Sequence, residues 1–233
     1  MNVAVCSRSF SAHPVLRSEL SRRFPGARFN DSGRTLSGSE LAVFLAGADG
    51  VVIALETVDG ALLDAAPSVR VIAKYGVGLD RIDLHALAAR GVQLGWTPGV
   101  NAQAVAEVVL ARTIDLVRGL TASDAAIRAG RFTQPLGRQV GALRVGILGC
   151  GHVGKAVARA FRALGARVIA HDIRDYADFY AAASVRPVDL ETLLAESDVL
   201  TVHLPLTSRT RGLVGAEALA QLPHGAILIN TAR

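Results

Sequence analysis

The chain has 233 residues, 51% of them hydrophobic, and carries a formal net charge of +5. No apolar run approaches the roughly 20 residues that a helix needs to cross a bilayer, so we expect no membrane span. The only two cysteines, Cys6 and Cys150, lie far apart, which excludes a disulfide framework and a cysteine-based metal site. The length suits one large domain or two modest ones.

The positive charge raises the question of nucleic acid. Nearly all of the 25 basic residues are arginines spread singly along the chain, and aromatic residues make up only 5%. Without a basic stripe interleaved with aromatics, we favour solvated surface charges over a nucleic-acid-binding surface. The first ten residues contain no basic stretch followed by a long apolar core. We therefore expect no secretory signal and a cytoplasmic location.

In the first hundred residues, short apolar runs alternate with helical patterns. Pro14 suits the first turn of a helix, Ser37 and Glu40 form a possible capping box, and Gly91 stands at a typical helix end. Strands that alternate with helices imply a parallel sheet covered on both faces. We predict strands at 3–5, 51–55, 69–73 and 92–94, and helices at 15–24, 41–48, 61–66 and 83–90.

The turn sequence WTPG at 96–99 interrupts this alternation. We place a domain boundary there, which gives a first domain of residues 1–99 and a second of residues 100–233. The expected fold class is α/β, with two doubly wound parallel-sheet domains. In the second domain we predict helices at 101–117, 123–129, 190–195 and 215–222, a connector at 130–141, and strands at 143–148, 168–170, 184–186, 198–202 and 226–229.

The most specific pattern in the chain lies in residues 143–172. An apolar run leads into the sequence GCGHVG at 149–154, a helical pattern follows, and a second apolar run leads to Asp172. Strand, glycine turn, helix, strand and acid in this order form the dinucleotide-binding fingerprint, whereas the glycines alone could be only a tight turn. We predict NAD, because a carboxylate at this place accepts both ribose hydroxyls and repels a 2′-phosphate. Arg174 is the one residue that could soften this repulsion.

Each glycine of this motif has a predicted task. Gly149 allows the tight turn out of the strand, Gly151 lets the backbone approach a pyrophosphate, and Gly154 lets the helix pack close to the sheet. The pyrophosphate is expected at the N-terminus of the helix that begins with His152 and Val153, where free amide groups favour an anion. Cys150 is interpreted as a small filler of the turn.

Four further motifs accompany the fingerprint. The sequence KYGVGLD at 74–80 follows a predicted strand, and its two glycines could orient successive amides into an anion-binding nest; the alternative is an ordinary strand-to-helix turn. The others are TPGVN at 97–101 followed by VAE at 105–107, HLPLT at 203–207, and INTAR at 229–233. Each of these alone could be a loop or a helix cap.

Taken together and in this order, the five motifs resemble the D-2-hydroxyacid dehydrogenase family, most closely its phosphoglycerate-dehydrogenase-like branch. The resemblance covers the whole chain. It implies a flavodoxin-like substrate domain, then a Rossmann domain that binds NAD. It further implies an oxidoreductase that acts on a small D-2-hydroxy acid or the matching 2-keto acid. The long helix at 101–117 corresponds to a dimer-forming helix of the family, so a homodimer is expected of a complete form of the protein.

The resemblance also assigns residues to the substrate. The amides of Gly76, Val77 and Gly78 would hold the substrate carboxylate. Asn101 would lie near the substrate and the nicotinamide, and Glu107 would help to shape the site from the long helix. These roles follow from the family and not from spacing or composition.

On the cofactor side, the resemblance assigns residues at the ends of two later strands: His203, Pro205, Thr207, Thr231 and Ala232. Arg233 matches the catalytic arginine of the family, whose planar guanidinium suits a bidentate contact with a carboxylate. The catalytic histidine and its acid partner follow that arginine in the family, and none of the six histidines here matches that position. We therefore expect a partial sequence or a natural truncation, with little turnover by itself.

Three other functions stay open at this point. The first is a non-catalytic NAD-sensing module, like the corepressors that resemble these dehydrogenases. The second is an inactive fragment. The third is a related enzyme on the same scaffold, such as a formate or phosphite dehydrogenase, which the GVG and LPLT loops fit less specifically.

Overall fold

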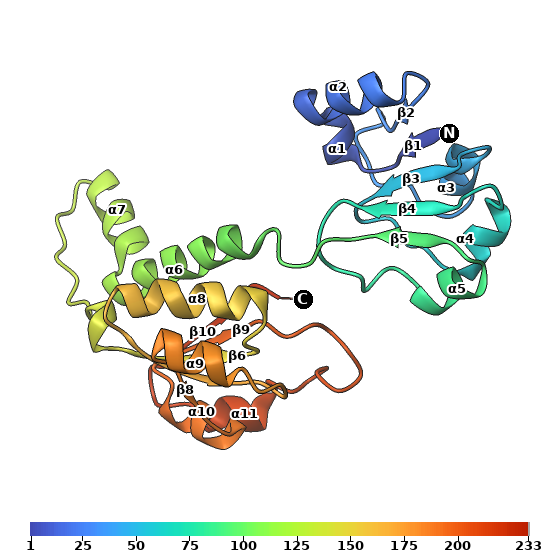
Figure 1. The fold of residues 1–233 in the computed structure, drawn as a ribbon. Coiled ribbons are helices and arrows are strands. Elements are labelled where there is room, and N and C mark those ends of the chain that lie inside the picture. Colours follow the sequence, from blue (N-terminus) through green and yellow to red (C-terminus); the bar gives the residue numbers. More distant parts are fainter. Residues whose placement is uncertain (233) are drawn as a thin grey trace. The chain divides into compact units, whose positions relative to one another are not determined.

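The computed structural model divides the chain into two compact units, Met1–Val100 and Asn101–Arg233 (Figure 1). It describes residues 1–232. Each unit contains a five-stranded parallel sheet with flanking helices, so the predicted α/β class with two doubly wound sheets is confirmed. Among the described residues, no helix is long and apolar enough to span a membrane.

The first unit has the strand order β2-β1-β3-β4-β5, which is the flavodoxin-like order. The central strand β3 reads GVVI and is buried along its whole length, as expected for a parallel strand inside a doubly wound sheet. The elements are β1 (Val3–Val5), α1 (Arg8–Ala12), α2 (Pro14–Arg23), β2 (Arg28–Phe29), α3 (Gly38–Leu45), β3 (Gly50–Ile53), α4 (Gly60–Ala65), β4 (Val71–Lys74), α5 (Leu84–Ala89) and β5 (Gln93–Gly95).

The possible capping box at the start of α3 is not formed. Ser37 is the N-cap residue, but its hydroxyl makes no cap hydrogen bond. Glu40 instead pairs both carboxylate oxygens with the guanidinium of Arg34, one of them at 2.7 Å from Nη1. The ion pair turns the carboxylate towards Arg34, and neither Ser37 nor Glu40 makes a capping hydrogen bond, so that prediction was wrong.

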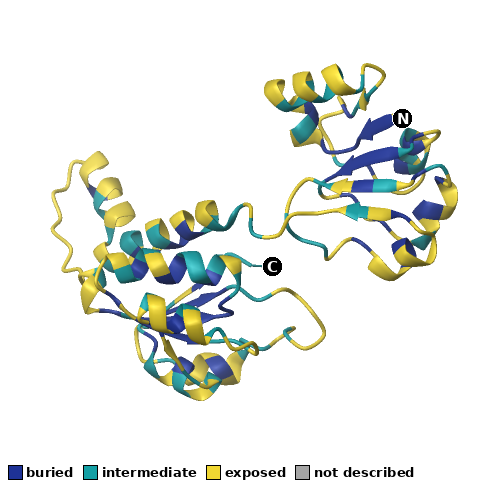
Figure 2. Cartoon of the chain, viewed as in Figure 1, coloured by how far each residue is buried: buried dark blue, intermediate teal, exposed yellow. Residues whose placement is uncertain are grey.

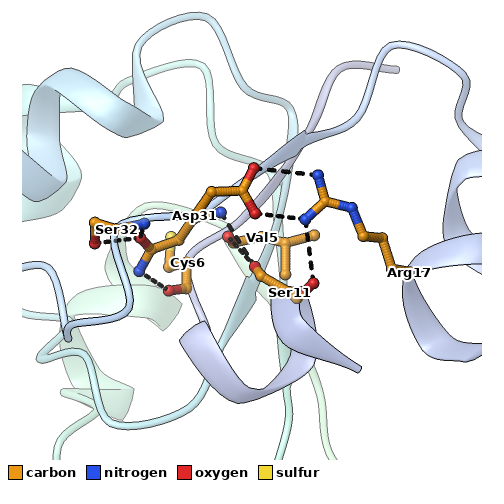
Figure 3. Close-up of polar contacts among 7 residues, drawn as sticks. Val5, Cys6, Ser11, Arg17, Asp31 and Ser32 are labelled. Carbon is orange, nitrogen blue, oxygen red and sulfur yellow. Dashed lines mark hydrogen bonds and ion pairs between the residues drawn. The ribbon is translucent and has the colours of Figure 1, made fainter. Parts of the chain in front are cut away.

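A polar cluster at the carboxyl end of β1, with a buried part around Asn30 and an exposed ion pair, is internally satisfied (Figure 3). The side-chain amide of Asn30 donates to the carbonyl of Cys6 at 2.8 Å, and its backbone amide donates to Ser11 Oγ at 3.1 Å. Arg17 forms a bidentate pair with Asp31, which lowers the pKa of that carboxyl. Burial raises the pKa of the Cys6 thiol far above its usual range. The cluster therefore ties β1 to the loop after β2 and offers no reactive group.

The second unit has the strand order β10-β9-β6-β7-β8, the Rossmann arrangement in which the order reverses beside β6. All its strand pairs are parallel. The elements are α6 (Ala102–Arg118), α7 (Leu120–Arg128), a short 3-10 helix (Val140–Ala142), β6 (Arg144–Leu148), α8 (His152–Ala163), β7 (Arg167–His171), α9 (Ala177–Ala183), β8 (Arg186–Pro187), α10 (Leu190–Glu196), β9 (Val199–Val202), α11 (Ala216–Ala220) and β10 (Ile227–Asn230).

Burial in this unit is concentrated on the strands and on one face of α8, whose buried residues include Val157 and Phe161 (Figure 2). The connector 131–139 is exposed along its whole length. Sequence patterns missed α1, β2 and α9, which are short, and placed several helix ends a few residues away. Their stability comes from packing on the sheets more than from their own periodicity.

Candidate cofactor and substrate sites

The turn between β6 and α8 has the geometry that the three glycines predict. Gly149 has a φ of +94°, which favours glycine, and a Cβ there would lie 3.0 Å from the carbonyl carbon and oxygen of His203. A Cβ on Gly154 would lie 2.2 Å from the carbonyl oxygen of Gly149. A Cβ on Gly151 would meet nothing within 4 Å. Gly149 and Gly154 are thus needed for packing inside the protein, while Gly151 borders open space.

The N-terminus of α8 is open to an anion. Its N-cap residue is Gly151, which has no side chain to accept a cap hydrogen bond, and its first turn carries no acidic residue. The first backbone amides of a helix have no partner within the helix, and the helix dipole adds partial positive charge there. His152 is exposed and Val153 half-buried at this end. A pyrophosphate beside Gly151 would meet these amides.

Asp172 follows β7 and has a second task that sequence reasoning missed. Its Oδ2 accepts a hydrogen bond from the backbone amide of Cys150 at 2.6 Å, and its Oδ1 accepts one from the amide of Arg174 at 2.9 Å. The carboxylate therefore ties the glycine turn to the end of β7. Each oxygen keeps acceptor capacity for a ligand hydroxyl.

The segment after β9 lies against the glycine turn, as the close approach of His203 to Gly149 requires. His203 Nε2 is 2.9 Å from the hydroxyl of the buried Thr201, and burial lowers the pKa of this histidine to about 4. The imidazole is therefore neutral at physiological pH. Pro205 and Thr207, the other two predicted residues of this segment, are exposed.

Thr210 is a residue of this segment that the sequence motif did not single out. Its hydroxyl oxygen lies 2.6 Å from the carbonyl of Pro205 and 2.8 Å from the backbone amide of Thr207. Pro205 and Thr207 are exposed, so packing contributes little to their position. The hydrogen bonds of Thr210 therefore fix the conformation of this segment. A pocket of about 180 Å³ lies between this segment and the end of β10, where Asn230 and Ala232 line it.

Among the described residues of this unit, two buried side-chain oxygens have no hydrogen-bond partner: Asn101 Oδ1 and Thr231 Oγ1. Asn101 is the N-cap of α6, yet its side chain makes no cap hydrogen bond, and Thr231 follows β10, against which α6 packs. Buried polar atoms are normally paired, so these two call for an external partner. Both were predicted to border the nicotinamide. The backbone amide of Ala232 donates to Asn230 Oδ1 at 2.9 Å. Arg233 lies outside the described residues.

In the first unit, the predicted nest follows β4. Gly76 has a φ of +125°, a conformation that glycine adopts readily. The indole Nε1 of Trp96 donates to the carbonyl of Val77 at 3.0 Å. A pocket of about 520 Å³ lies beside the nest, lined among others by Tyr75, Gly76 and Trp96. Glu107, on α6 of the second unit, is exposed and accepts a hydrogen bond from Gln103 at 3.2 Å.

These features fit a dinucleotide. Open space at Gly151, the uncapped start of α8, the Asp172 carboxylate and the two unpartnered atoms all suit the parts of NAD that such a fold binds. Among the described residues, no group of three or more histidine, cysteine, aspartate or glutamate side chains is arranged to hold a metal ion.

Comparison with known proteins decides the family. Residues 110–233, more than half of the chain, match the model of the D-isomer specific 2-hydroxyacid dehydrogenase, NAD binding domain. The chain belongs to this family. The second unit therefore contains the NAD-binding domain of this family. The fingerprint predicted the dinucleotide site, and the resemblance of the five motifs predicted the family.

Individual relatives agree with this assignment. The chain is 34% identical over 189 residues to the glyoxylate reductase of Korarchaeum cryptofilum, a match that covers 78% of this chain and 57% of that protein. It is 37% identical over 179 residues to the D-3-phosphoglycerate dehydrogenase of Mycobacterium tuberculosis, covering 76% of this chain and 34% of the relative. The chain thus spans about half or less of the length of these relatives.

Solved structures share the whole fold. The D-lactate dehydrogenase of Escherichia coli is 26% identical, with a TM-score of 0.83, and the match covers 100% of this chain and 74% of that one. A protein of Thermus thermophilus is 32% identical, with a TM-score of 0.85 and the same coverage.

Proposed function

We propose that this D-2-hydroxyacid dehydrogenase family member transfers a hydride between NAD and a small D-2-hydroxy acid or the matching 2-keto acid. The observation that carries the proposal is the glycine turn. Gly149 and Gly154 are packed tightly, Gly151 borders open space, and Asp172 is tied to the same turn. NAD supplies hydride transfer at its nicotinamide ring when bound.

The residues of the chain would bind and orient the substrate. The amides of Gly76, Val77 and Gly78 would hold the carboxylate, with Asn101 beside the reacting carbon. Arg233 would make a bidentate contact with the substrate carboxylate and polarise the neighbouring carbonyl of the substrate. It cannot exchange a proton, because a guanidinium stays protonated. We assign no proton transfer to His203, because a pKa of about 4 makes its imidazole a weak base near pH 7.

The cofactor-facing residues of the second unit would act together. His152 and Val153 would present backbone amides to the pyrophosphate, and Thr231 and Ala232 would border the nicotinamide. The unpartnered Oγ1 of Thr231 supports this role. An NAD-sensing module without activity is not favoured, because the relatives named above are reductases and dehydrogenases.

The test is an assay of the protein with NADH and a panel of 2-keto acids that includes glyoxylate, pyruvate and hydroxypyruvate, beside direct titration of NADH. We expect saturable NADH binding by residues 1–233, and only slow oxidation of NADH by them, because none of the residues assigned above exchanges the substrate proton. Oxidation of NADH with at least one acid of the panel is expected from a protein that also carries the histidine and acid of the family. NADH binding by both proteins, without turnover by the second, would favour the sensing module. Absence of NADH binding would refute the cofactor site itself.

We also propose a homodimer in which α6 forms part of the interface. Apolar side chains on α6 and α7 are exposed, with Val108 at 51%, Leu116 at 56% and Ile127 at 56%. Exposed large apolar side chains on two consecutive helices support a protein-binding surface there. The alternative is that both domains of one chain bury this helix. Light scattering at micromolar concentration distinguishes the two, and a stable monomer would refute the dimer.

A further inference from the structure

Trp96 occupies a place that the family resemblance did not mark. It directly follows β5 in the first unit, and its side chain is 41% exposed. Although the residue is exposed, its indole N–H has a defined partner. It donates to the carbonyl of Val77, the middle residue of the nest, at 3.0 Å.

This hydrogen bond constrains the nest through the geometry of the peptide bond. The carbonyl of Val77 and the amide of Gly78 belong to one planar trans unit, in which the C=O and the N–H point in opposite directions. An indole that holds the carbonyl on one side therefore holds the Gly78 N–H on the other side. Among the described residues, neither Gly76 nor Gly78 donates its backbone amide to an acceptor, so both are available to a ligand.

Glycines on both sides of Val77 make such a restraint valuable. Gly76 has a φ of +125°, and a glycine backbone rotates more freely than that of any other residue. Without a fixed neighbour, the Val77–Gly78 peptide could turn and lose the alignment of its amide with that of Gly76. A nest binds an anion only when successive amides point the same way.

We propose that Trp96 is a positioning residue for the substrate carboxylate: its hydrogen bond to Val77 fixes the Gly78 amide in the orientation that binds the anion. The inference rests on the proposed function, in which the nest holds a 2-keto or 2-hydroxy acid. Trp96 and Gly76 also line the same pocket, so a bound carboxylate lies close to the indole ring.

The chain offers a direct readout, because Trp96 is its only tryptophan. Glyoxylate, the simplest 2-keto acid, is titrated into the unmodified protein without cofactor, so that no turnover occurs, beside sodium chloride at equal ionic strength. We expect a saturable change in tryptophan fluorescence with glyoxylate and none with chloride. No saturable binding of glyoxylate would refute the carboxylate site and the present inference together.

Two ring-conserving variants then separate the hydrogen bond from the pocket. Trp96→Phe removes the indole N–H and keeps an aromatic ring. Tyr75→Phe alters the same pocket and keeps the indole N–H that donates to Val77, because Tyr75 takes no part in that hydrogen bond. Calorimetry should show glyoxylate affinity reduced about 3- to 10-fold in Trp96→Phe, the size expected for one hydrogen bond, while Tyr75→Phe reports how far the affinity depends on the lining of the pocket.

A readout independent of ligand affinity is the nuclear magnetic resonance signal of the Gly78 amide in protein without ligand. Trp96→Phe should shift or broaden it, and Tyr75→Phe should not. NADH affinity should remain the same in both variants. If Trp96→Phe binds glyoxylate as tightly as the unmodified protein and leaves the Gly78 signal in place, the positioning role is wrong while the proposed function stands.

Discussion

Two alanine substitutions in one turn should affect different properties: Gly151→Ala should weaken NADH binding, and Gly154→Ala should lower the stability of the fold. Both add a single methyl group, and they lie three positions apart. At Gly154 the new Cβ would lie 2.2 Å from the carbonyl oxygen of Gly149, whereas ordinary contact begins near 3.4 Å. At Gly151 it would meet no protein atom within 4 Å, and a φ of −70° suits alanine.

The expected cost at Gly154 follows from this distance. The turn and α8 must separate by about 1 Å, and the atom in the way is a backbone oxygen that cannot rotate aside. Overpacking of this kind costs about 1–3 kcal/mol, while replacing glycine by alanine inside a helix returns at most about 1 kcal/mol. We expect a net loss of about 1–2 kcal/mol and a melting temperature about 3–8 °C lower.

Gly151→Ala should leave stability within about 0.5 kcal/mol of the unmodified protein, because its methyl group points into open space. That space is where the pyrophosphate would approach the backbone. Steric exclusion by one methyl group should therefore weaken NADH by about 10-fold or more, equivalent to about 1.4 kcal/mol. The same glycine-to-alanine change thus affects only NADH binding at Gly151, and the stability of the fold at Gly154.

The assays are thermal unfolding by circular dichroism and titration of NADH by its own fluorescence, on the three proteins in parallel. Gly154→Ala needs its binding measured well below its melting temperature, so that unfolding does not imitate lost affinity. If Gly151→Ala bound NADH as tightly as the unmodified protein, the pyrophosphate would not lie beside this glycine. If Gly154→Ala unfolded at an unchanged temperature, the packing argument would be wrong.

Three further predictions concern single side chains. Asp172→Asn should weaken NADH binding at least about tenfold. It should also reduce the preference for NADH over NADPH, measured as the ratio of the two dissociation constants, because a neutral amide no longer repels the 2′-phosphate. Equal ratios in the variant and the unmodified protein would contradict this. The pKa of His203 is lowered to about 4 from 6.5, so the unfolded chain binds more protons between these values and stability should fall as the pH drops from about 6.5 towards 4. Melting temperatures of His203→Gln should vary less over that range, and an equal slope would exclude this histidine as the cause. Thr210→Ala should weaken NADH several-fold by releasing the segment 205–207, while Thr210→Ser, which keeps the hydroxyl, should restore binding; failure of serine to do so would assign the effect to the lost methyl group.

The two α/β units and the glycine turn were predictable because their signals are local. Alternating apolar runs and helical patterns reflect one periodic face at a time, and the fingerprint at 149–154 needs only the order of neighbouring elements. The short elements α1 and α9 were missed for the opposite reason. A helix of one or two turns has too few residues for a clear period and is stable only against the sheet.

The sequence by itself therefore determined the fold class, the NAD-binding turn and its carboxylate. Only the tertiary structure decided which groups hold one another. The hydrogen bonds from Cys150 to Asp172 and from Trp96 to Val77 join residues about twenty positions apart, and they exist because parallel strands bring their carboxyl ends to one edge. No local pattern encodes that meeting. The unpartnered oxygens of Asn101 and Thr231 are likewise a property of packing, because burial is set by what surrounds an atom and not by its own residue type.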